Sequence, residues 1–213
     1  MSKTTKKWGM VIDLRKCIGC HSCSVACKTE NEVPPAVFRS WVKLMDKGVY
    51  PNARSLSLPV LCNNCENAVC VKVCPVKASY KRDDGIVMVD PHKCVGCKYC
   101  MAACPYQVRH LNPIRRYVQK CSFCYQRVDA GLMPACVETC PARARVFGDL
   151  NDPTSEIVKL LVENPTSVLK PESGTKPNVF YIALDKDIVD PLKGVDIEHH
   201  IKHAKDALEG VFE

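Results

Sequence analysis

The chain has 213 residues, a formal net charge of +7 and 16 cysteines, and 25% of its residues are charged. This length allows one domain or two small ones, and no segment approaches the roughly 18 consecutive apolar residues of a membrane-spanning helix. The first residues contain neither an apolar stretch nor a small-residue cleavage site, so we expect no signal peptide and no direct membrane span.

The first third of the chain predicts a strand, a short helix and a hairpin that carries no cysteine. Residues 8–13 are typical of a β-strand, and residues 22–30 predict a helical turn. Residues 38–45 and 55–61 predict the two strands of an inserted β-hairpin. Apolar side chains alternate along the second of these segments, and turn-forming residues separate the two.

A second hairpin and a long loop are expected further along the chain. Asp84 and Gly85 form a turn signal between two β-prone arms, which predicts a second hairpin. Residues 125–135 separate two cysteines and predict an irregular loop with a short helix at 125–130. This loop either shields a neighbouring site or meets a partner.

Residues 150–213 predict an extended tail that wraps a partner subunit or the chain's own core. Helical spacing at 153–163 is followed by an apolar, strand-like run at 179–184 with nothing obvious of its own to bury it. A last amphipathic helix is expected at 195–213. We interpret its three histidines as part of a solvated helix face rather than a metal or haem site. They are His199, His200 and His203.

All sixteen cysteines fall into four groups of four, which we number in chain order. The groups are Cys17, Cys20, Cys23 and Cys27; Cys62, Cys65, Cys70 and Cys74; Cys94, Cys97, Cys100 and Cys104; and Cys121, Cys124, Cys136 and Cys140. Groups one and three have the spacing C-x2-C-x2-C-x3-C. Group two reads C-x2-C-x4-C-x3-C, and group four reads C-x2-C-x11-C-x3-C.

This spacing is typical of iron–sulfur cubanes. Three thiolates surround one cluster, and in the bacterial ferredoxin pattern the fourth ligates the other cluster of a pair. Sixteen thiolates therefore predict four [4Fe–4S] clusters. Gly19 and Gly96 separate the first two cysteines of groups one and three, where glycine lets the loop close so that its amides face the sulfides. Because the metal supplies much of the folding free energy, we expect the apo chain to be largely unfolded.

Zinc and disulfides are the alternative uses of these cysteines. Zinc sites usually draw their ligands from two separated C-x2-C pairs. Disulfide scaffolds are usually shorter and denser in cysteine than this chain. A zinc-binding interaction module nevertheless remains an alternative, and a colourless preparation containing zinc would support it.

The expected fold class is α+β, with two bacterial-ferredoxin-like two-cluster modules related by a pseudo-twofold repeat. Groups two and three follow the ferredoxin layout and form one module, residues 62–105. By elimination, groups one and four form the other, residues 1–32 plus 106–149. The hairpin of residues 33–61 is inserted between them, and the tail of residues 150–213 follows.

The basic charge is concentrated in the cysteine-rich part. Residues 1–149 hold 23 Lys and Arg against 11 Asp and Glu, whereas residues 150–213 hold 7 against 12. A basic domain can bind nucleic acid, but each cubane with four thiolates carries roughly −2, so four clusters offset most of the excess. We therefore expect no nucleic-acid partner. Six lysines next to ligands could raise cluster potentials: Lys28, Lys72, Lys77, Lys93, Lys98 and Lys120. At least half of them are expected to be ordinary solvated charges.

The four spacings, in this order, closely resemble those of the four-cluster electron-transfer subunit of molybdopterin oxidoreductases of the dimethyl sulfoxide reductase superfamily. The runs at 11–35 and 134–150 are most similar to the iron–sulfur subunit of polysulfide, thiosulfate and tetrathionate reductases. The resemblance implies crossed ligation within each module. The four sets would be Cys17, Cys20, Cys23 with Cys140; Cys121, Cys124, Cys136 with Cys27; Cys94, Cys97, Cys100 with Cys74; and Cys62, Cys65, Cys70 with Cys104.

The resemblance also implies a function without catalysis by this chain, in which no set of catalytic residues stands out. Electrons would pass between an integral membrane quinol-binding subunit and a molybdopterin catalytic subunit that contains molybdenum or tungsten. The group-two cluster would face the membrane subunit and the group-one cluster the catalytic subunit, giving the order two, three, four, one. The direction of transfer is left open.

The resemblance further implies a peripheral, membrane-associated location. We expect the extracytoplasmic face, reached by co-export with a partner that bears a twin-arginine signal, and the cytoplasmic face is the alternative. A soluble polyferredoxin-type carrier for hydrogenase or other redox enzymes is the competing function. The apolar run at 179–184 argues against that carrier.

Overall fold

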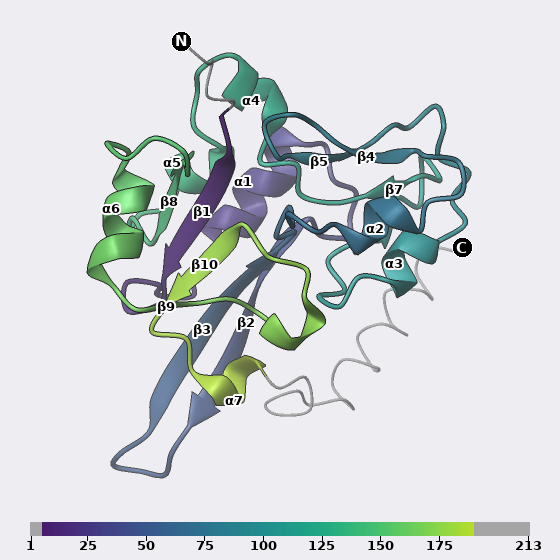
Figure 1. Cartoon of the computed structure of the whole chain (residues 1–213). Coiled ribbons are helices and arrows are strands. Elements are labelled where there is room, and N and C mark those ends of the chain that lie inside the picture. Colours follow the sequence, from purple (N-terminus) through teal and green to yellow (C-terminus); the bar gives the residue numbers. More distant parts are fainter. Residues whose placement is uncertain (1–5, 190–213) are drawn as a thin grey trace, which may run out of the picture.

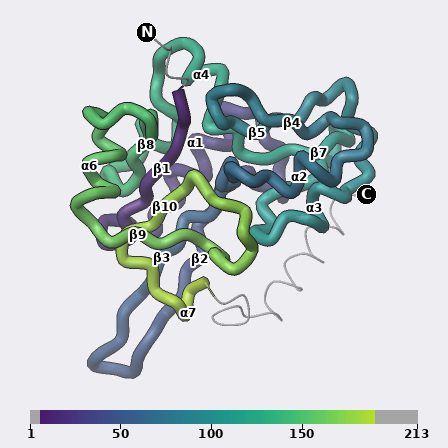
Figure 2. Tube along the Cα trace, in the orientation of Figure 1, coloured from purple at the N-terminus to yellow at the C-terminus, as the bar shows by residue number. Residues whose placement is uncertain are grey.

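We analysed a computed structural model of the chain, which describes residues 6–189. The helix expected at 195–213, with its three histidines, lies outside the described residues. The described part contains a four-stranded sheet on one side and a region of short helices and hairpins on the other (Figure 1). The long inserted hairpin projects away from both, which the tube in Figure 2 follows clearly.

The sheet has the strand order β8-β1-β10-β9. Its strands are β8 (Arg145–Asp149), β1 (Trp8–Asp13), β10 (Val179–Ile182) and β9 (Thr166–Ser167). Strand β1 runs antiparallel to β8 and parallel to β10, and β10 is antiparallel to β9. Residues 10–12 of β1 are completely buried, and such a continuous apolar run is typical of a strand covered on both faces.

Over residues 150–189 the tail packs on the core of this chain, which is one of the two expected possibilities. Strand β10 pairs with β1 near the centre of the sheet, and Val179 and Tyr181 are fully buried. The Tyr181 hydroxyl donates a hydrogen bond to the Pro59 carbonyl at 3.0 Å. Helix α6 (Glu156–Glu163) packs on the same sheet through Ile157. The run at 179–184 therefore finds its cover in this chain and no longer argues against a soluble carrier.

The predicted hairpins are formed by neighbouring antiparallel strands. Strand β2 (Ser40–Lys47) pairs with β3 (Arg54–Leu61), in register from Ser40 opposite Leu61. Strand β4 (Ser79–Lys81) pairs with β5 (Val87–Val89) around the turn at Gly85. A third pair, β6 (His110–Leu111) with β7 (Val118–Gln119), follows group three.

Short helices accompany the cysteine groups. They are α1 (Ser22–Glu30), α2 (Val69–Lys72), α3 (Tyr99–Ala102), α4 (Tyr125–Asp129) and α5 (Ala135–Glu138). A 3-10 turn at Pro171–Ser173 and helix α7 (Lys186–Val189) complete the described chain. Helix α1 contacts α5, and α2 contacts α3. The helices of groups one and four thus lie together, as do those of groups two and three.

Candidate functional site

Two cavities in the region of α2 and α3 are each lined by four cysteines. Each combines three cysteines of one group with the last cysteine of the other. One is lined by Cys62, Cys65, Cys70 and Cys104, and the other by Cys74, Cys94, Cys97 and Cys100. These are the two sets that the resemblance implies for this half of the molecule, and we call them set two and set three after the group that supplies three thiols.

The remaining cysteines gather in the same crossed way beside α1 and α5. Burial raises the pKa of Cys17, and the nearby thiols of Cys23 and Cys140 raise it further. The structure thus brings part of group one together with the last cysteine of group four. We call these three thiols, with Cys20, set one.

The other crossed set includes Cys27 on α1 and Cys136 on α5. Burial raises the pKa of Cys27 to about 12, and Cys136 and Cys124 add to the shift. Cys121 has Cys27 among its neighbours as well. The Asn31 side-chain amide lies 3.8 Å from the sulfur atoms of both Cys27 and Cys124. Cys121, Cys124 and Cys136 with Cys27 form set four.

The tight loops that precede α1 and α3 require glycine. Gly19 and Gly96 have φ values of +69° and +68°, a region that side chains disfavour. A Cβ on Gly19 would also lie 2.8 Å from the Ser57 hydroxyl oxygen and 2.9 Å from a Leu44 methyl carbon. The group-one loop is therefore closed against the inserted hairpin, and the loop-geometry interpretation of these two glycines is confirmed.

Two buried arginines that the sequence analysis missed hydrogen-bond to cysteine sulfur. Arg109 donates through Nη2 to Cys70 Sγ at 2.8 Å. Arg145 donates through Nη2 to Cys23 Sγ at 3.2 Å and through Nη1 to Cys136 Sγ at 3.5 Å. A signal for both exists in the sequence, because each arginine follows the last cysteine of its group by five residues, in the pattern C-P-x3-R.

The four sets are arranged differently from the expected order. The thiol of Cys62 in set two is among the charges that raise the pKa of Cys121 in set four, after burial and the other thiols of set four. Lys120 lies beside both of these thiols and beside Cys70. Set two, not set three, is therefore the neighbour of set four, and the order two, three, four, one is wrong as a spatial sequence. The contacts place the sets in the spatial order three, two, four, one.

The two ends of this sequence reach the surface. Cys20 of set one and Cys97 of set three are the exposed cysteines of the described chain. Each follows a glycine and an exposed apolar residue, Ile18 at one end and Val95 at the other. All the thiols of set four are buried, and those of set two are buried or half-buried. The geometry thus has two accessible ends and a protected middle.

The residues present fit iron–sulfur clusters. A cubane takes one thiolate at each of four iron atoms, whereas a single zinc ion needs its ligands in direct contact. Within residues 6–189, no group of three or more His, Cys, Asp or Glu is arranged to hold a single metal ion. Buried polar atoms without a partner in the described chain face set two: Arg109 Nη1 and the amide of Asn63, between the first two cysteines of the set. Such donors suit sulfide acceptors.

Backbone amides supply further donors to sulfur. Ser79 N–H donates to Cys74 Sγ at 3.5 Å, and Ala144 N–H donates to Cys140 Sγ at 3.4 Å. The Ser79 amide lies five residues after the last cysteine of group two, and the Ala144 amide lies four residues after the last cysteine of group four. Hydrogen bonds of this kind stabilise the negative charge on a cluster sulfur and raise its reduction potential.

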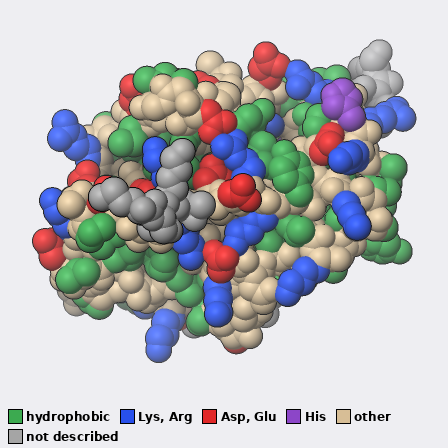
Figure 3. Space-filling view, turned by 45° about the horizontal axis from the view of Figure 1, so that its top comes forward, with side chains coloured by type: hydrophobic (Ala, Val, Ile, Leu, Met, Phe, Trp, Pro, Cys, Tyr) green, Lys and Arg blue, Asp and Glu red, His purple; other side chains and the backbone are tan. Residues whose placement is uncertain are grey.

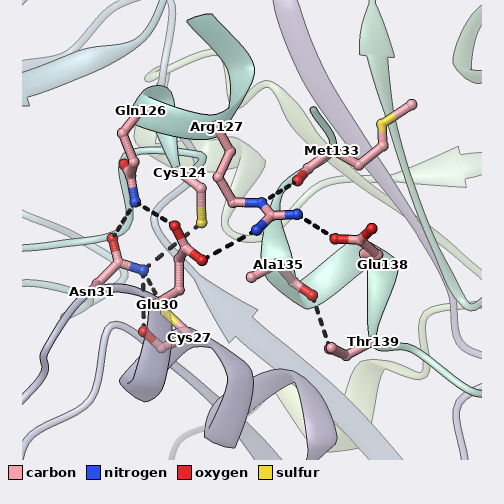
Figure 4. A network of polar contacts seen from close by, with 10 residues as sticks. All are labelled: Cys27, Glu30, Asn31, Cys124, Gln126, Arg127, Met133, Ala135, Glu138 and Thr139. Atoms are coloured by element: carbon pink, nitrogen blue, oxygen red, sulfur yellow. Dashed lines mark hydrogen bonds and ion pairs between the residues drawn. The ribbon is translucent and has the colours of Figure 1, made fainter. Parts of the chain in front are cut away.

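Polar contacts join the loop at 125–135 to α1 and α5, the helices that carry Cys27 and Cys136 of set four (Figure 4). Arg127 on α4 pairs with Glu30 on α1 at 3.3 Å, pairs with Glu138 on α5, and donates to the Met133 carbonyl at 2.8 Å. Gln126 also donates to Glu30. The start of the loop is the expected short helix, and these contacts hold the loop against α1 and α5.

Most of the lysines next to ligands are surface charges. Lys72, Lys77, Lys93 and Lys98 are exposed, whereas Lys28 donates to two backbone carbonyls at 2.7 Å. Lys120 is the buried exception. Figure 3 shows Lys and Arg side chains spread over one face among acidic ones. No helix in the described residues is long and apolar enough to cross a membrane.

Comparison with known proteins gives a consistent result. A family model described as a 4Fe-4S dicluster domain matches residues 53–150, and one described as a 4Fe-4S binding domain matches residues 8–29. The chain is 48% identical to a tetrathionate reductase subunit of Salmonella typhimurium, over 88% of this chain and 77% of that protein.

Two further relatives show that the similarity extends over most of the chain. A polysulfide reductase chain of Wolinella succinogenes is 47% identical, over 83% of this chain and 94% of its own length. The putative dimethyl sulfoxide reductase iron-sulfur subunit of Halobacterium salinarum is 43% identical, over 91% of this chain and 86% of that protein.

Proposed function

Because this protein belongs to the family of iron–sulfur subunits of tetrathionate, polysulfide and dimethyl sulfoxide reductases, we propose that it transfers electrons within a respiratory reductase complex. The observation that carries this proposal is the row of four thiol sets, with an exposed cysteine at each end. No catalytic role is assigned to the chain itself. Its two ends serve two different partners.

Four [4Fe–4S] clusters are proposed as the cofactors, one in each thiol set. When bound, the clusters supply one-electron redox chemistry. The protein holds them through the crossed pairs of helices, excludes water from sets two and four, and donates hydrogen bonds to their sulfur ligands. The matching positions of Arg109 and Arg145, each five residues after the last cysteine of its group, support a repeat of one two-cluster module.

The partners follow from the two accessible ends. The end at Cys20 is proposed to face a molybdopterin catalytic subunit, and the end at Cys97 a membrane subunit that exchanges electrons with quinol. The expectation that group two faces the membrane subunit is replaced by group three, because set two lies inside the row. A sulfur compound is proposed as the terminal substrate, since the tetrathionate and polysulfide relatives have 48% and 47% identity.

Membrane association is proposed to occur through the membrane subunit. The extracytoplasmic face is preferred, with export alongside a catalytic partner, and the cytoplasmic face is the alternative. Cell fractionation followed by protease treatment of intact spheroplasts distinguishes the two faces. Digestion of the chain in spheroplasts places it outside, and protection until lysis places it inside.

Affinity purification of the full chain from solubilised membranes tests the proposal. We expect a large molybdopterin subunit to co-purify, and about sixteen iron atoms per chain. The recovered complex should reduce tetrathionate or polysulfide with a reduced dye as electron donor. Recovery of an iron-loaded chain without a large partner would instead support the polyferredoxin-type carrier, and a zinc-loaded, colourless chain would support the interaction module.

A further inference from the structure

Three lysine and arginine side chains are buried within residues 6–189: Arg109, Lys120 and Arg145, which are 5%, 4% and 3% exposed. All other described Lys and Arg residues are partly or fully exposed. Burying a cation is costly unless a negative charge lies near it. Each of these three lies between two different thiol sets.

Arg109 lies at the junction of sets three and two. Its Nη2 atom is 2.8 Å from Cys70 Sγ of set two and 3.1 Å from the Ser79 hydroxyl oxygen. The same guanidinium lies beside Cys100 of set three, where it offsets part of the rise that burial causes in the pKa of that thiol. One side chain therefore reaches both sets of this module.

Arg145 takes the same position at the junction of sets four and one. Its two terminal nitrogens donate to Cys136 of set four and to Cys23 of set one. Its third partner is again a serine hydroxyl, that of Ser40 at 3.2 Å. The two halves of the molecule thus place an arginine, with a serine beside it, between their paired sets.

Lys120 occupies the remaining junction, between sets two and four. Its Nζ atom donates to Asn64 Oδ1 at 3.2 Å, to the Cys121 carbonyl at 2.8 Å and to the Val87 carbonyl. Three oxygen acceptors match the three N–H donors of an ammonium group, which has no acceptor of its own. This geometry suits the ammonium form of the side chain; burial lowers its pKa, and the neighbouring charges of Cys62, Cys121 and Cys70 oppose that shift.

No carboxylate neutralises these cations in the described part of the chain. Their hydrogen-bond partners are cysteine sulfur, hydroxyl oxygen, amide oxygen and backbone carbonyls. The one buried carboxylate of residues 6–189, Asp13, is held by Arg15. The compensating negative charge must come from the thiol sets, and each cation faces two of them.

We propose that Arg109, Lys120 and Arg145 are junction cations that set the reduction potentials of neighbouring clusters in pairs, an inference that rests on the proposed function. Reduction adds a negative charge to a cluster that is already negative. A cation between two clusters stabilises the reduced form of both, and it offsets their repulsion when both are reduced. Each of the three junctions along the row of four sets therefore carries one buried cation.

Redox titrations of the anaerobically purified, full-length holoprotein, followed by electron paramagnetic resonance, test this inference. The variants Arg109→Gln, Lys120→Gln and Arg145→Gln remove the charge and keep a polar side chain of similar shape. Each should lower two of the four potentials. At a fixed potential the ratio of reduced to oxidised cluster should fall about tenfold, or about 59 mV for a one-electron couple.

The pattern across the variants is more informative than any single shift. The two clusters affected by Arg109→Gln and the two affected by Lys120→Gln should share one member. Lys120→Gln and Arg145→Gln should share another, and the two arginine variants should share none. Lys98→Gln is the matched control, because Lys98 adjoins Cys97 but is exposed, and it should change the ratio less than threefold.

Conservative variants separate charge from packing. Arg109→Lys and Arg145→Lys should keep potentials near those of the unmodified protein, and Asn64→Asp should lower the same two potentials as Lys120→Gln. Shifts in all four clusters, in one cluster, or no larger than in Lys98→Gln would overturn the inference. So would loss of iron from both the Gln and the Lys variant of a junction arginine. If the unmodified protein lacks four titrating clusters, the proposed function itself fails.

Discussion

The packing of α6 on the central sheet can be tested with Ile157→Ala. Ile157 is completely buried and packs against Val11 and Ile182. Its Cγ2 atom lies 2.9 Å from the position that a Cβ on Gly148 would occupy, so the helix and the sheet meet in close contact. If residues 150–189 belong to the core, this truncation destabilises the chain without any partner.

The magnitude follows from the atoms removed. The substitution deletes three carbon atoms from a fully buried side chain, which costs roughly 2.4 kcal/mol at about 0.8 kcal/mol per methylene. The residual cavity brings the loss of unfolding free energy to about 3 kcal/mol, within the usual 2–5 kcal/mol for such truncations. The higher helix propensity of alanine returns a few tenths of a kcal/mol.

Unfolding releases the clusters, so the rate of cluster loss in urea is the quantity to measure. Absorbance near 400 nm and far-UV circular dichroism are followed together under anaerobic conditions. We expect Ile157→Ala to lose its clusters at least about tenfold faster, since about 1.4 kcal/mol corresponds to a factor of ten. Val162→Ala, on the same helix but 82% exposed, is the control. Equal rates for the two variants would refute the packing of α6 on the core.

Three other perturbations have definite expected results. Gly19→Ala should lower the iron content from about sixteen toward about twelve atoms per chain, because a Cβ there would lie 2.8 Å from Ser57 Oγ. Gly131→Ala, whose Cβ meets nothing within 4 Å, should keep its iron. Arg127→Gln should speed hydrogen exchange at 125–135 and leave exchange at 62–105 unchanged, because it breaks the contacts with α1 and α5. The Asp185 carboxylate accepts from the Asp187 amide and pairs with two cations of the long hairpin, which lowers its pKa. Its stabilising effect is present above the unfolded pKa of about 3.9 and is lost only as pH falls through the lower folded value. Asp185→Asn should therefore speed amide hydrogen exchange in α7 relative to the unmodified protein by a factor that stays constant from pH 8 to 5.

The local elements could be read from the sequence because their causes are local. The segments expected at 8–13 and 22–30 match β1 and α1. The long hairpin, expected at 38–45 and 55–61, has its strands at 40–47 and 54–61. The role of residues 179–182 could not be inferred, because their partner strand lies about 170 residues earlier in the chain. An apolar run shows that burial is needed, but not which surface provides it.

The thiol sets show the same division between pattern and placement. Cysteine spacing assigned the groups to modules, and the family resemblance implied the crossed sets, two of which line separate cavities in the structure. The spacing did not predict which set of one module faces the other, since that depends on how residues 62–65 pack against Lys120 and Cys121. The spacing C-x-G-C in groups one and three marks the two ends of the row. Only the structure shows that these loops are the exposed ones.

The net charge of the chain does not by itself indicate the effect on the clusters, because buried and exposed cations contribute differently. A unit charge about 7 Å from a cluster contributes roughly 0.6 kcal/mol in water but about 2.4 kcal/mol at an effective dielectric constant of 20. Salt screens the exposed lysines further. Three buried cations therefore outweigh a larger number of surface ones in setting the cluster potentials. Solubility and partner attraction depend on the whole basic surface, whereas the energy of each electron depends mainly on Arg109, Lys120 and Arg145.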